Sequence, residues 1–206
     1  MTDTQRIALT FDDGPANWTE PILATLQAHG AHATFFLIGS SAEQQPDLVR
    51  RIASEGHEIG NHSWSHPALA RECDDERVRD ELQRTNDVLA SILGAQPTRF
   101  RAPYYDVDER VKAVAATLGL THTHGDILPP DWHPGTKAAM IGALVLQQVA
   151  SGMIVGLHDG IPPAPSAPGG TRQATVDAIA SIVPRLVDRG FELVTASELL
   201  AGGSTA

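Results

Sequence analysis

Two adjacent carboxylates, Asp12 and Asp13, follow an apolar run over residues 7–11 and are followed at once by Gly14 and Pro15. The run is typical of a short buried strand, which Gly-Pro ends. Neighbouring side chains at the end of a strand point to opposite sides. We therefore expect one carboxylate to bind a metal ion while the other stays free as a base. Because Asp, Gly and Pro are common turn formers, a simple turn is the alternative interpretation.

Two histidines four residues apart, His62 and His66, form the second group that could bind a metal. In an extended segment they would lie ~13 Å apart, at ~3.3 Å per residue. In a helical turn they would share one face, ~6 Å apart along the axis, within reach of metal–nitrogen bonds of ~2.1 Å. With Asp13 they would supply three ligands and leave a fourth position open, as in catalytic zinc sites. Zn²⁺ is the expected metal, and Co²⁺, Ni²⁺ or Mn²⁺ stay possible. Chance spacing among nine histidines is the alternative.

Other polar side chains at or soon after predicted strand ends could complete a hydrolytic site around water activated by the metal. Asp12 could act as the base, and His158 could protonate the leaving group. Arg101 could hold Asp12 ionised, and Asp131 could orient His158 and stabilise its imidazolium. A single Arg, Asp or His at a strand end is more often structural. These roles therefore depend on the residues occurring together.

Strand-like and helix-like segments alternate along the chain. The apolar spacing predicts helices over residues 19–29, 46–55, 75–93, 108–118, 136–150 and 171–189, each followed by a glycine. The expected strands cover residues 7–11, 33–38, 58–61, 99–101, 120–124, 153–157 and 191–195. Such alternation predicts an α/β fold with parallel strands, either a barrel or an open doubly wound sheet. We favour a barrel with about seven parallel strands in a single domain over residues 6–200. The polar residues above then meet where the strands end, the face on which such folds build active sites.

The composition argues against several classes of partner and site. The formal net charge is −10 and no Lys/Arg-rich run is present, so neither nucleic acid nor an anionic membrane surface is expected to bind. The single cysteine, Cys73, excludes an internal disulfide. No apolar stretch approaches the ~18 residues of a membrane span, and the first residues lack the apolar part of a signal peptide. We expect a cytoplasmic protein, unless a signal peptide has been removed.

Five ordered motifs resemble those of the polysaccharide deacetylase family, also called the NodB homology domain or carbohydrate esterase family 4. They are Thr10-Phe11-Asp12-Asp13-Gly14-Pro15, His62-Ser-Trp-Ser-His66-Pro67, Arg101-Ala-Pro103-Tyr104, Asp131-Trp132 and Ile154-Val-Gly-Leu-His158-Asp159. The resemblance implies a distorted (β/α) barrel and a metal-dependent hydrolase that removes N- or O-acetyl groups from sugars.

Carried over onto the matching positions, the resemblance assigns the residues of the reaction. These are Asp12 as the base, Asp13, His62 and His66 as metal ligands, His158 as the acid, and Arg101 and Asp131 as the supports of base and acid. One departure concerns the fourth motif, because the family usually has Asp-x-x-Asp-Trp, whereas here Asp126 precedes Asp131 by five residues. We therefore expect the loop that carries Asp131 to be reshaped.

The resemblance also implies substrate contacts. The backbone amide of Tyr104 would help to hold the oxyanion, an interaction suited to acyl transfer. Trp132 would form a pocket wall or simply pack, and Gly156 and Leu157 would lie at the acyl group. Because Gly156 replaces a leucine that usually lines the pocket for the acetyl methyl, we expect a roomier acyl pocket.

These residues predict an enzyme that removes N-acetyl groups from an aminosugar, a chitooligosaccharide or a related carbohydrate. The alternatives within enzymes are O-deacetylation, as on acetylated xylan, and other amide or imide hydrolysis. A catalytically inactive sugar-binding module is the alternative outside enzymes. It is disfavoured because such proteins usually lose the acid–base pair, and both Asp12 and His158 are present here.

Overall fold

The computed structural model describes residues 5–163 and 170–202. These residues form seven strands whose pairings are all parallel. The strands are β1 (Gln5–Asp12), β2 (Thr34–Leu37), β3 (Glu58–Asn61), β4 (Arg99–Phe100), β5 (Thr121–His122), β6 (Ile154–His158) and β7 (Phe191–Leu193). The predicted strand number and direction are confirmed, although β4 and β5 are shorter than expected.

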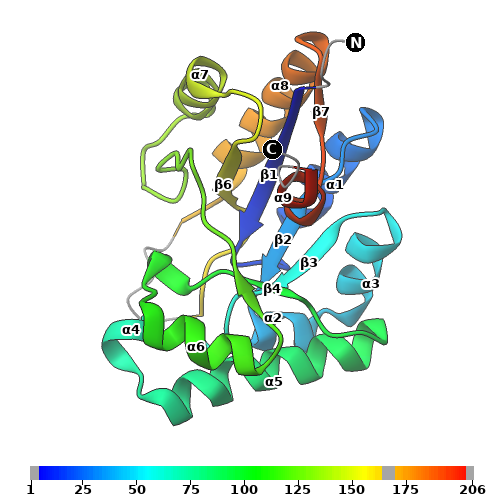
Figure 1. Cartoon of the computed structure of the whole chain (residues 1–206). Helices are drawn as coiled ribbons and strands as arrows, with labels where there is room; N and C mark the ends of the chain where they lie inside the picture. Colours follow the sequence, from blue (N-terminus) through cyan, green and yellow to red (C-terminus); the bar gives the residue numbers. More distant parts are fainter. Residues whose placement is uncertain (1–4, 164–169, 203–206) are drawn as a thin grey trace.

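Strand β1 lies at the centre of the sheet (Figure 1). Its residues 10–12 pair with β2, residues 8–12 pair with β6, and residues 5–7 pair with β7. Strands β3, β4 and β5 continue the sheet beyond β2, which gives the order β5-β4-β3-β2-β1-β6. The side chains of β1 from Ile7 onward are all buried, as expected for a central parallel strand covered on both faces.

The gap between the two end strands, β5 and β6, is bridged by a short segment rather than by a strand. Ile127 forms an isolated parallel bridge with Val155. Its backbone amide donates to the carbonyl of Ile154, and its carbonyl accepts from the amide of Gly156. The sheet therefore curves into a distorted barrel, as predicted, and the open doubly wound sheet is excluded.

Helices surround the sheet, with α4, α5 and α6 at one side of the molecule and α7 and α8 at another (Figure 1). The helices are α1 (Thr19–Ala28), α2 (Gly39–Gln44), α3 (Pro46–Ser54), α4 (Leu69–Glu72), α5 (Asp75–Leu93), α6 (Glu109–Thr117), α7 (Ala138–Gln148), α8 (Gln173–Asp188) and α9 (Ala196–Gly202), with a 3₁₀ turn, η1 (Pro103–Tyr105). The long helices match those expected from the apolar periodicity. The short helices α2, α4 and α9 were not predicted, because helices of one or two turns are too short to show the apolar periodicity of a helix.

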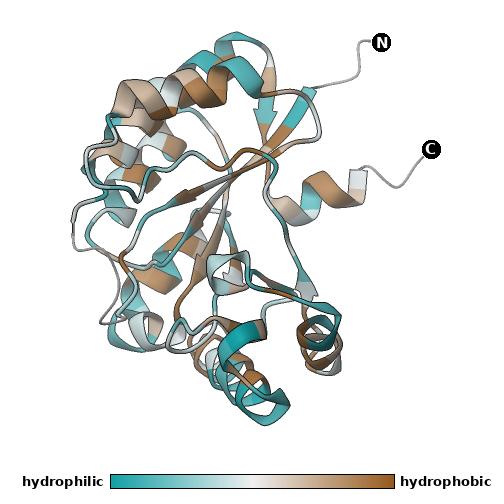
Figure 2. Cartoon of the chain, turned by 90° about the vertical axis from the view of Figure 1, so that its left-hand side faces the viewer, coloured by the Kyte–Doolittle hydropathy of each residue, from teal (hydrophilic) through white to brown (hydrophobic). Residues whose placement is uncertain are grey.

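The largest hydrophobic core lies between the outer face of the sheet and the helices. Alternate residues of the strands point into it, among them Leu9, Phe11, Phe35 and Val155. Apolar residues of α1, α3, α7 and α8 complete this core, and the rings of Phe11 and Phe35 stack at 5.0 Å between centroids. Figure 2 shows the apolar residues gathered on the strands and along parts of the helices.

The inner face of the sheet changes character along the strands. At its amino-terminal end, Ala8 and Ile154 pack against α9 through Ala196 and Leu199. At its carboxyl-terminal end the inner residues are polar, and Asp12 of β1 lies opposite His158 of β6. The fold therefore closes one end of the barrel with apolar side chains and gathers polar groups at the other.

Among the described residues, none of the helices combines the length and the apolar character that crossing a bilayer requires.

A buried histidine at the edge of the core makes stability depend on pH. The Nδ1 of His57 accepts a hydrogen bond from the backbone amide of Ala33 (3.3 Å), and its ring meets that of Phe35 edge-on. Burial lowers the pKa of His57 to about 4, from the ordinary value of 6.5. The folded state therefore keeps this imidazole neutral at a pH where the unfolded chain binds a proton.

We predict that the free energy of unfolding falls as the pH drops from about 6.5 towards 4, and that His57 accounts for about 2 kcal/mol of this loss by pH 5. A His57→Leu variant should therefore lose about 2 kcal/mol less than the wild type between pH 7 and pH 5, as measured by urea unfolding. His29→Gln, at an exposed position after α1, is the matched control and should keep the wild-type slope. An unchanged slope in His57→Leu would contradict the prediction.

Candidate active site

A cleft of about 370 Å³ opens at the carboxyl-terminal end of the barrel. Strand ends and the loops that follow them supply its walls. Its lining residues are Asp12, Asp13, His62, His66, Tyr104, Tyr105, Leu128, Pro129, Trp132, Gly156, His158, Pro162 and Arg172. Residues from all five sequence motifs are thus brought together in one cavity.

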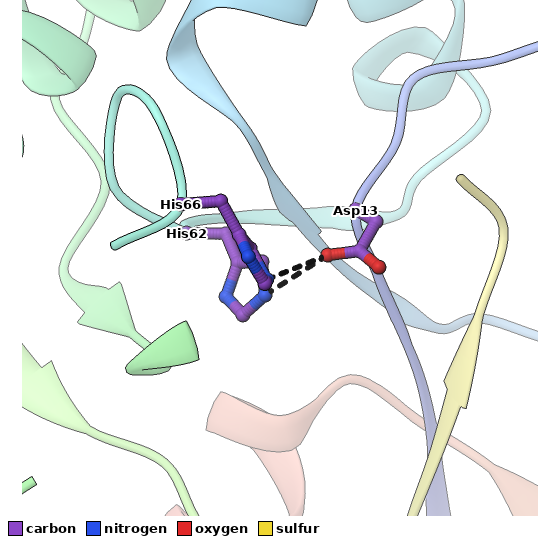
Figure 3. A group of neighbouring side chains, drawn as sticks. All are labelled: Asp13, His62 and His66. Atoms are coloured by element: carbon purple, nitrogen blue, oxygen red, sulfur yellow. Dashed lines mark ion pairs between the residues drawn. The ribbon is translucent and has the colours of Figure 1, made fainter. Parts of the chain in front are cut away.

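Asp13, His62 and His66 converge within this cleft (Figure 3). The Nε2 atoms of His62 and His66 lie 3.3 Å and 3.0 Å from Oδ1 of Asp13. One ligand atom from each residue lies within 4.8 Å of the other two, and all three residues are buried. The expectation that Asp12 and Asp13 point to opposite sides is wrong, because both line the cleft. The left-handed backbone of Asp13 (φ 75°) breaks the alternation of the strand.

The two histidines do not share a helical turn, which corrects the expectation from their spacing. Residues 62–66 form an irregular loop in which Ser63 (φ 63°) and His66 (φ 65°) adopt left-handed conformations. The bend still brings the imidazole centroids to 5.1 Å from each other. A loop with two left-handed residues therefore achieves the proximity that we expected from a helix.

A buried carboxylate of α5, Glu81, holds this loop in place. Its Oε2 accepts hydrogen bonds from the backbone amides of Trp64 (2.9 Å) and Ser65 (2.8 Å), and its Oε1 accepts one from the Ser65 hydroxyl (2.6 Å). Oδ1 of Asn61 accepts from the amide of Ser63 (2.8 Å). Sequence reasoning missed Glu81, although a charged residue on the apolar face of a long helix was a usable signal.

The protonation of the two imidazoles fits a cation. Nδ1 of His62 lies 2.8 Å from the carbonyl oxygen of Arg101, which can only accept, so this nitrogen carries the proton and Nε2 is free to act as a ligand. Burial lowers the pKa of His66 and favours its neutral form. Oδ1 of Asp13 is buried and has no hydrogen-bond donor among the described residues. Two imidazole nitrogens and one carboxylate oxygen therefore face one point, and these residues fit a divalent metal ion.

The second carboxylate, Asp12, is held by a guanidinium inside the barrel. Arg101 is fully buried, and its Nη1 donates to Oδ1 of Asp12 (2.8 Å) and to the hydroxyl of Thr10 (2.7 Å). Its Nε and Nη2 donate to the carbonyls of Thr123 (3.2 Å) and His124 (2.9 Å). Because all three nitrogens of the guanidinium donate hydrogen bonds, it fixes the position of the Asp12 carboxylate next to the metal-ligand group.

His158 and Asp131 form a second charged pair across the cleft. Nδ1 of His158 lies 2.7 Å from Oδ1 of Asp131, and its backbone amide donates to Oδ2 (2.8 Å). The Thr175 hydroxyl also donates to Oδ2 (2.8 Å). Burial alone would lower the pKa of His158, but the charge and hydrogen bond of Asp131 raise it to about 9. The imidazolium is therefore the resting form at neutral pH.

The loop that carries Asp131 is held by backbone and side-chain hydrogen bonds, and its reshaping relative to the family stays a prediction. Asp126 does not join Asp131, because its carboxylate accepts from the backbone amide of Ile154 (2.8 Å) and faces His124 (3.1 Å). The intervening Pro129 accepts from the amide of Asp131 in a tight turn. The loop thus brings Asp131 to His158, although it has two more residues between the two aspartates than the Asp-x-x-Asp pattern of the family.

Not all of the predicted substrate-contacting residues line the cleft. Tyr104 (54% exposed) and Trp132 (43% exposed) line the mouth of the cleft, and the ring of Tyr104 meets that of His66 edge-on at 4.7 Å. Gly156 also lines the cleft, whereas the Leu157 side chain packs in the hydrophobic core. The expected contact of the Leu157 side chain with substrate is therefore wrong, because successive side chains of β6 point to opposite faces.

The expectation that Gly156 makes the acyl pocket roomier is wrong, because neighbouring side chains fill the space that a side chain on this residue would take. A Cβ atom on this residue would lie 2.6 Å from the Tyr105 hydroxyl and 2.7 Å from Cδ2 of Leu128. The sequence did not single out Tyr105, Leu128 or Arg172 as cleft residues. Arg172 is buried at the start of α8, and its Nε donates to the carbonyl of Gly160 (2.8 Å).

Comparison with known proteins agrees with this geometry. The family model described as "Polysaccharide deacetylase" matches residues 1–123. A chitooligosaccharide deacetylase of Bradyrhizobium sp. (strain ANU 289) is 39% identical over 199 residues, which cover 94% of this chain and 90% of that protein. A peptidoglycan-N-acetylglucosamine deacetylase of Bacillus cereus is 38% identical over 190 residues, 92% of this chain but 66% of that protein.

A solved structure shares the whole architecture. The family 4 acetyl xylan esterase of Clostridium thermocellum, crystallised with a cobalt ion, superposes with a TM-score of 0.84 at 34% sequence identity. The match covers 96% of this chain and 91% of that one. This chain therefore shares its fold with a protein whose solved structure holds a cobalt ion.

We predict that Glu81 is needed for metal affinity although it is not a ligand. Glu81→Ala would leave the amides of Trp64 and Ser65 without their acceptor and loosen the loop, which should weaken the binding of Zn²⁺ or Co²⁺ by about 10- to 100-fold. Calorimetric titration of the metal-free protein measures this change. Glu76→Ala, at an exposed position on the same helix, is the control, and equal affinities in the two variants would contradict the prediction.

Proposed function

The chain belongs to the polysaccharide deacetylase family, and from this membership we propose that it is a metal-dependent hydrolase that removes the N-acetyl group from an amino sugar. The substrate class is a chitooligosaccharide or a related N-acetylated glycan, and the products are acetate and the free amine. The observation that supports this most directly is the meeting of Asp13, His62 and His66 with Asp12 and His158 in one cleft.

Asp13, His62 and His66 would hold the metal ion. Two imidazole nitrogens and one carboxylate oxygen suit Zn²⁺ best, and Co²⁺, Ni²⁺ and Mn²⁺ are the alternatives. When bound there, the ion supplies Lewis-acid polarisation of the acetyl carbonyl and makes water more acidic. The metal-ligand triad also fixes where the acetyl group must lie, between these side chains and Asp12.

Asp12 takes a proton from the attacking water. Its carboxylate is held by Arg101, so it does not need to reorient as the reaction begins. Tyr104 contributes its backbone amide to the developing oxyanion, and the exposed ring of Trp132 forms a wall for the sugar. In this scheme Arg101 is a positioning residue, because it acts through Asp12.

His158 protonates the departing nitrogen. The hydrolysis breaks the C–N bond, adds hydroxide to the acetyl carbon and delivers a proton to the amine, so that acetate and the amino sugar are released. Asp131 orients the imidazole through Nδ1 and stabilises its charged form, which leaves Nε2 to act as the acid.

O-deacetylation is the second candidate, and the similarity to an acetyl xylan esterase favours it. Ester hydrolysis would use the same residues, since the carbonyl, the attacking water and the leaving oxygen occupy equivalent positions. The two activities are separated by comparing acetate release from N-acetylchitooligosaccharides with release from acetylated xylan fragments.

We predict metal-dependent acetate release from N-acetylchitooligosaccharides that depends on Asp12. A chelator should abolish the activity, and Zn²⁺ or Co²⁺ should restore it. Asp12→Asn should reduce kcat by about 10²- to 10⁴-fold, the usual contribution of a general base, while one metal ion still binds. Asp47→Asn, at an almost fully exposed carboxylate of α3, serves as the control. Wild-type turnover in Asp12→Asn would exclude Asp12 as the base.

We also predict that Asp131 sets the basic limb of the pH profile. Because the pKa of His158 is raised to about 9, the acid stays protonated at neutral pH and activity should fall as the pH rises through about 9. Asp131→Asn removes the charge that raises this pKa, so the basic limb should move to lower pH and the rate should drop most above pH 7. A bound metal ion would offset the charge of Asp13 equally in the wild type and in Asp131→Asn. The prediction therefore concerns the difference between their two pH profiles.

The matched control for this profile is Asp177→Asn, at an exposed position on α8, the helix that also carries Thr175. Its basic limb should coincide with that of the wild type. If Asp131→Asn also keeps the wild-type limb, the coupling of Asp131 to His158 is refuted.

A further inference from the structure

A buried tyrosine hydroxyl in the cleft packs closely against two glycines. A Cβ on Gly125 would lie 2.8 Å from Oη of Tyr105, and a Cβ on Gly156 would lie 2.6 Å from the same atom. Any larger residue at either position would displace the hydroxyl. Both glycines therefore leave room for the hydroxyl of Tyr105.

This hydroxyl has no structural partner. Oη of Tyr105 is buried and forms no hydrogen bond with any described residue. A buried hydroxyl without a partner destabilises the fold by about 1–3 kcal/mol, and a phenylalanine ring would fill nearly the same space without this cost. Packing therefore explains the ring of Tyr105 but not its oxygen.

The position of the hydroxyl relative to the reacting groups is defined by β6. Gly156 precedes His158 by two residues and faces the same side, so the hydroxyl lies deeper in the barrel than the proposed acid. The Cβ position of Gly156 is 3.8 Å from Nη1 of Arg101, which itself donates to Asp12. The hydroxyl thus lies near the floor beneath the proposed base.

The shape of the cleft decides which part of a substrate reaches this floor. The exposed Tyr104 and Trp132 mark the mouth, where a bulky sugar has room, whereas Gly156 and the hydroxyl of Tyr105 are buried. With the sugar at the mouth and the scissile carbonyl between Asp12 and the metal ligands, the small acyl tail points towards the buried hydroxyl. Cδ2 of Leu128 lies near the same two Cβ positions (2.6 Å and 2.7 Å), and since Leu128 is 47% exposed its side chain has room to rotate.

We propose that Tyr105 recognises a hydroxyl group on the acyl chain, and that the enzyme accepts N-glycolyl (2-hydroxyacetyl) amino sugars as substrates. This inference rests on the proposed function and specifies the acyl group of the same reaction. A glycolyl hydroxyl can both donate to and accept from Oη of Tyr105, whereas an acetyl methyl leaves that oxygen unpaired. Hydrolysis adds hydroxide to the glycolyl carbonyl carbon, breaks the C–N bond and protonates the amine, releasing glycolate and the free amino sugar.

The test compares N-glycolyl- and N-acetylchitooligosaccharides of equal length on the zinc-loaded protein, with kcat and KM measured for each. We expect Tyr105→Phe to lower the glycolyl-to-acetyl ratio of kcat/KM by about five- to tenfold, the effect of one neutral hydrogen bond. The change should lie mainly in KM, because the contact is remote from the reacting bond. Ser91→Ala, which removes an exposed hydroxyl on α5, should keep the wild-type ratio. An unchanged ratio in Tyr105→Phe would overturn the proposal.

Failure of this inference is distinguishable from failure of the proposed function. If the wild type released neither acetate nor glycolate, the proposed function would be wrong. Calorimetric binding of the two oligosaccharides to Asp12→Asn, with and without Tyr105→Phe, then still tests Tyr105. The role of Tyr105 would be supported if the double variant bound the N-glycolyl sugar more weakly than Asp12→Asn does, with binding of the N-acetyl sugar unchanged. Equal binding of the N-glycolyl sugar by the two variants would overturn it.

Discussion

The buried guanidinium of Arg101 connects the parts of the site more directly than any other single group. Its Nη1 fixes Asp12 at the end of β1, and its Nε and Nη2 bind the carbonyls of the segment that follows β5. The backbone carbonyl of Arg101 accepts a hydrogen bond from Nδ1 of His62 and so sets the direction of that imidazole. Phe36 lies beneath the guanidinium at 4.3 Å. A fully desolvated cation is tolerated only when every donor has a partner, so the barrel interior must keep this arrangement to stay folded.

The balance of charge in the cleft follows from this arrangement. Asp12 is paired with Arg101, and Asp131 is paired with the protonated His158. The third carboxylate, Asp13, faces the imidazoles of His62 and His66, and burial favours the neutral form of His66. Asp13 is thus the cleft carboxylate without a permanent cation beside it, and a divalent ion would complete the pairing. This physical reason for a metal does not depend on the similarity to other proteins.

Much of the fold and site was predictable because it depends on sequence order and strand direction alone. Asp12, Asp13, His62, Arg101 and His158 each lie at or just after the end of a parallel strand, and such ends meet at one edge. What failed depends on single backbone angles or side-chain directions. The left-handed φ of Asp13 and His66 has only a weak sequence signal, since Asp and His adopt it more often than most residues but still rarely. The filling of the space at Gly156 by Tyr105 and Leu128 depends on segments that meet only in the folded protein.

The left-handed backbone conformations of the described non-glycine residues gather around the site. All non-glycine residues with positive φ in the described part of the chain, Asp13, Ser63, His66, Tyr104 and Tyr105, belong to the loops that line or support the cleft. Each such conformation costs on the order of 1 kcal/mol or more and persists only where its surroundings enforce it. In the loop of residues 62–66, Glu81 and Asn61 enforce these conformations by accepting hydrogen bonds from three consecutive backbone amides. The stability of the barrel therefore holds the ligands and the proposed base in place before substrate arrives, and no costly reorganisation is required during the reaction.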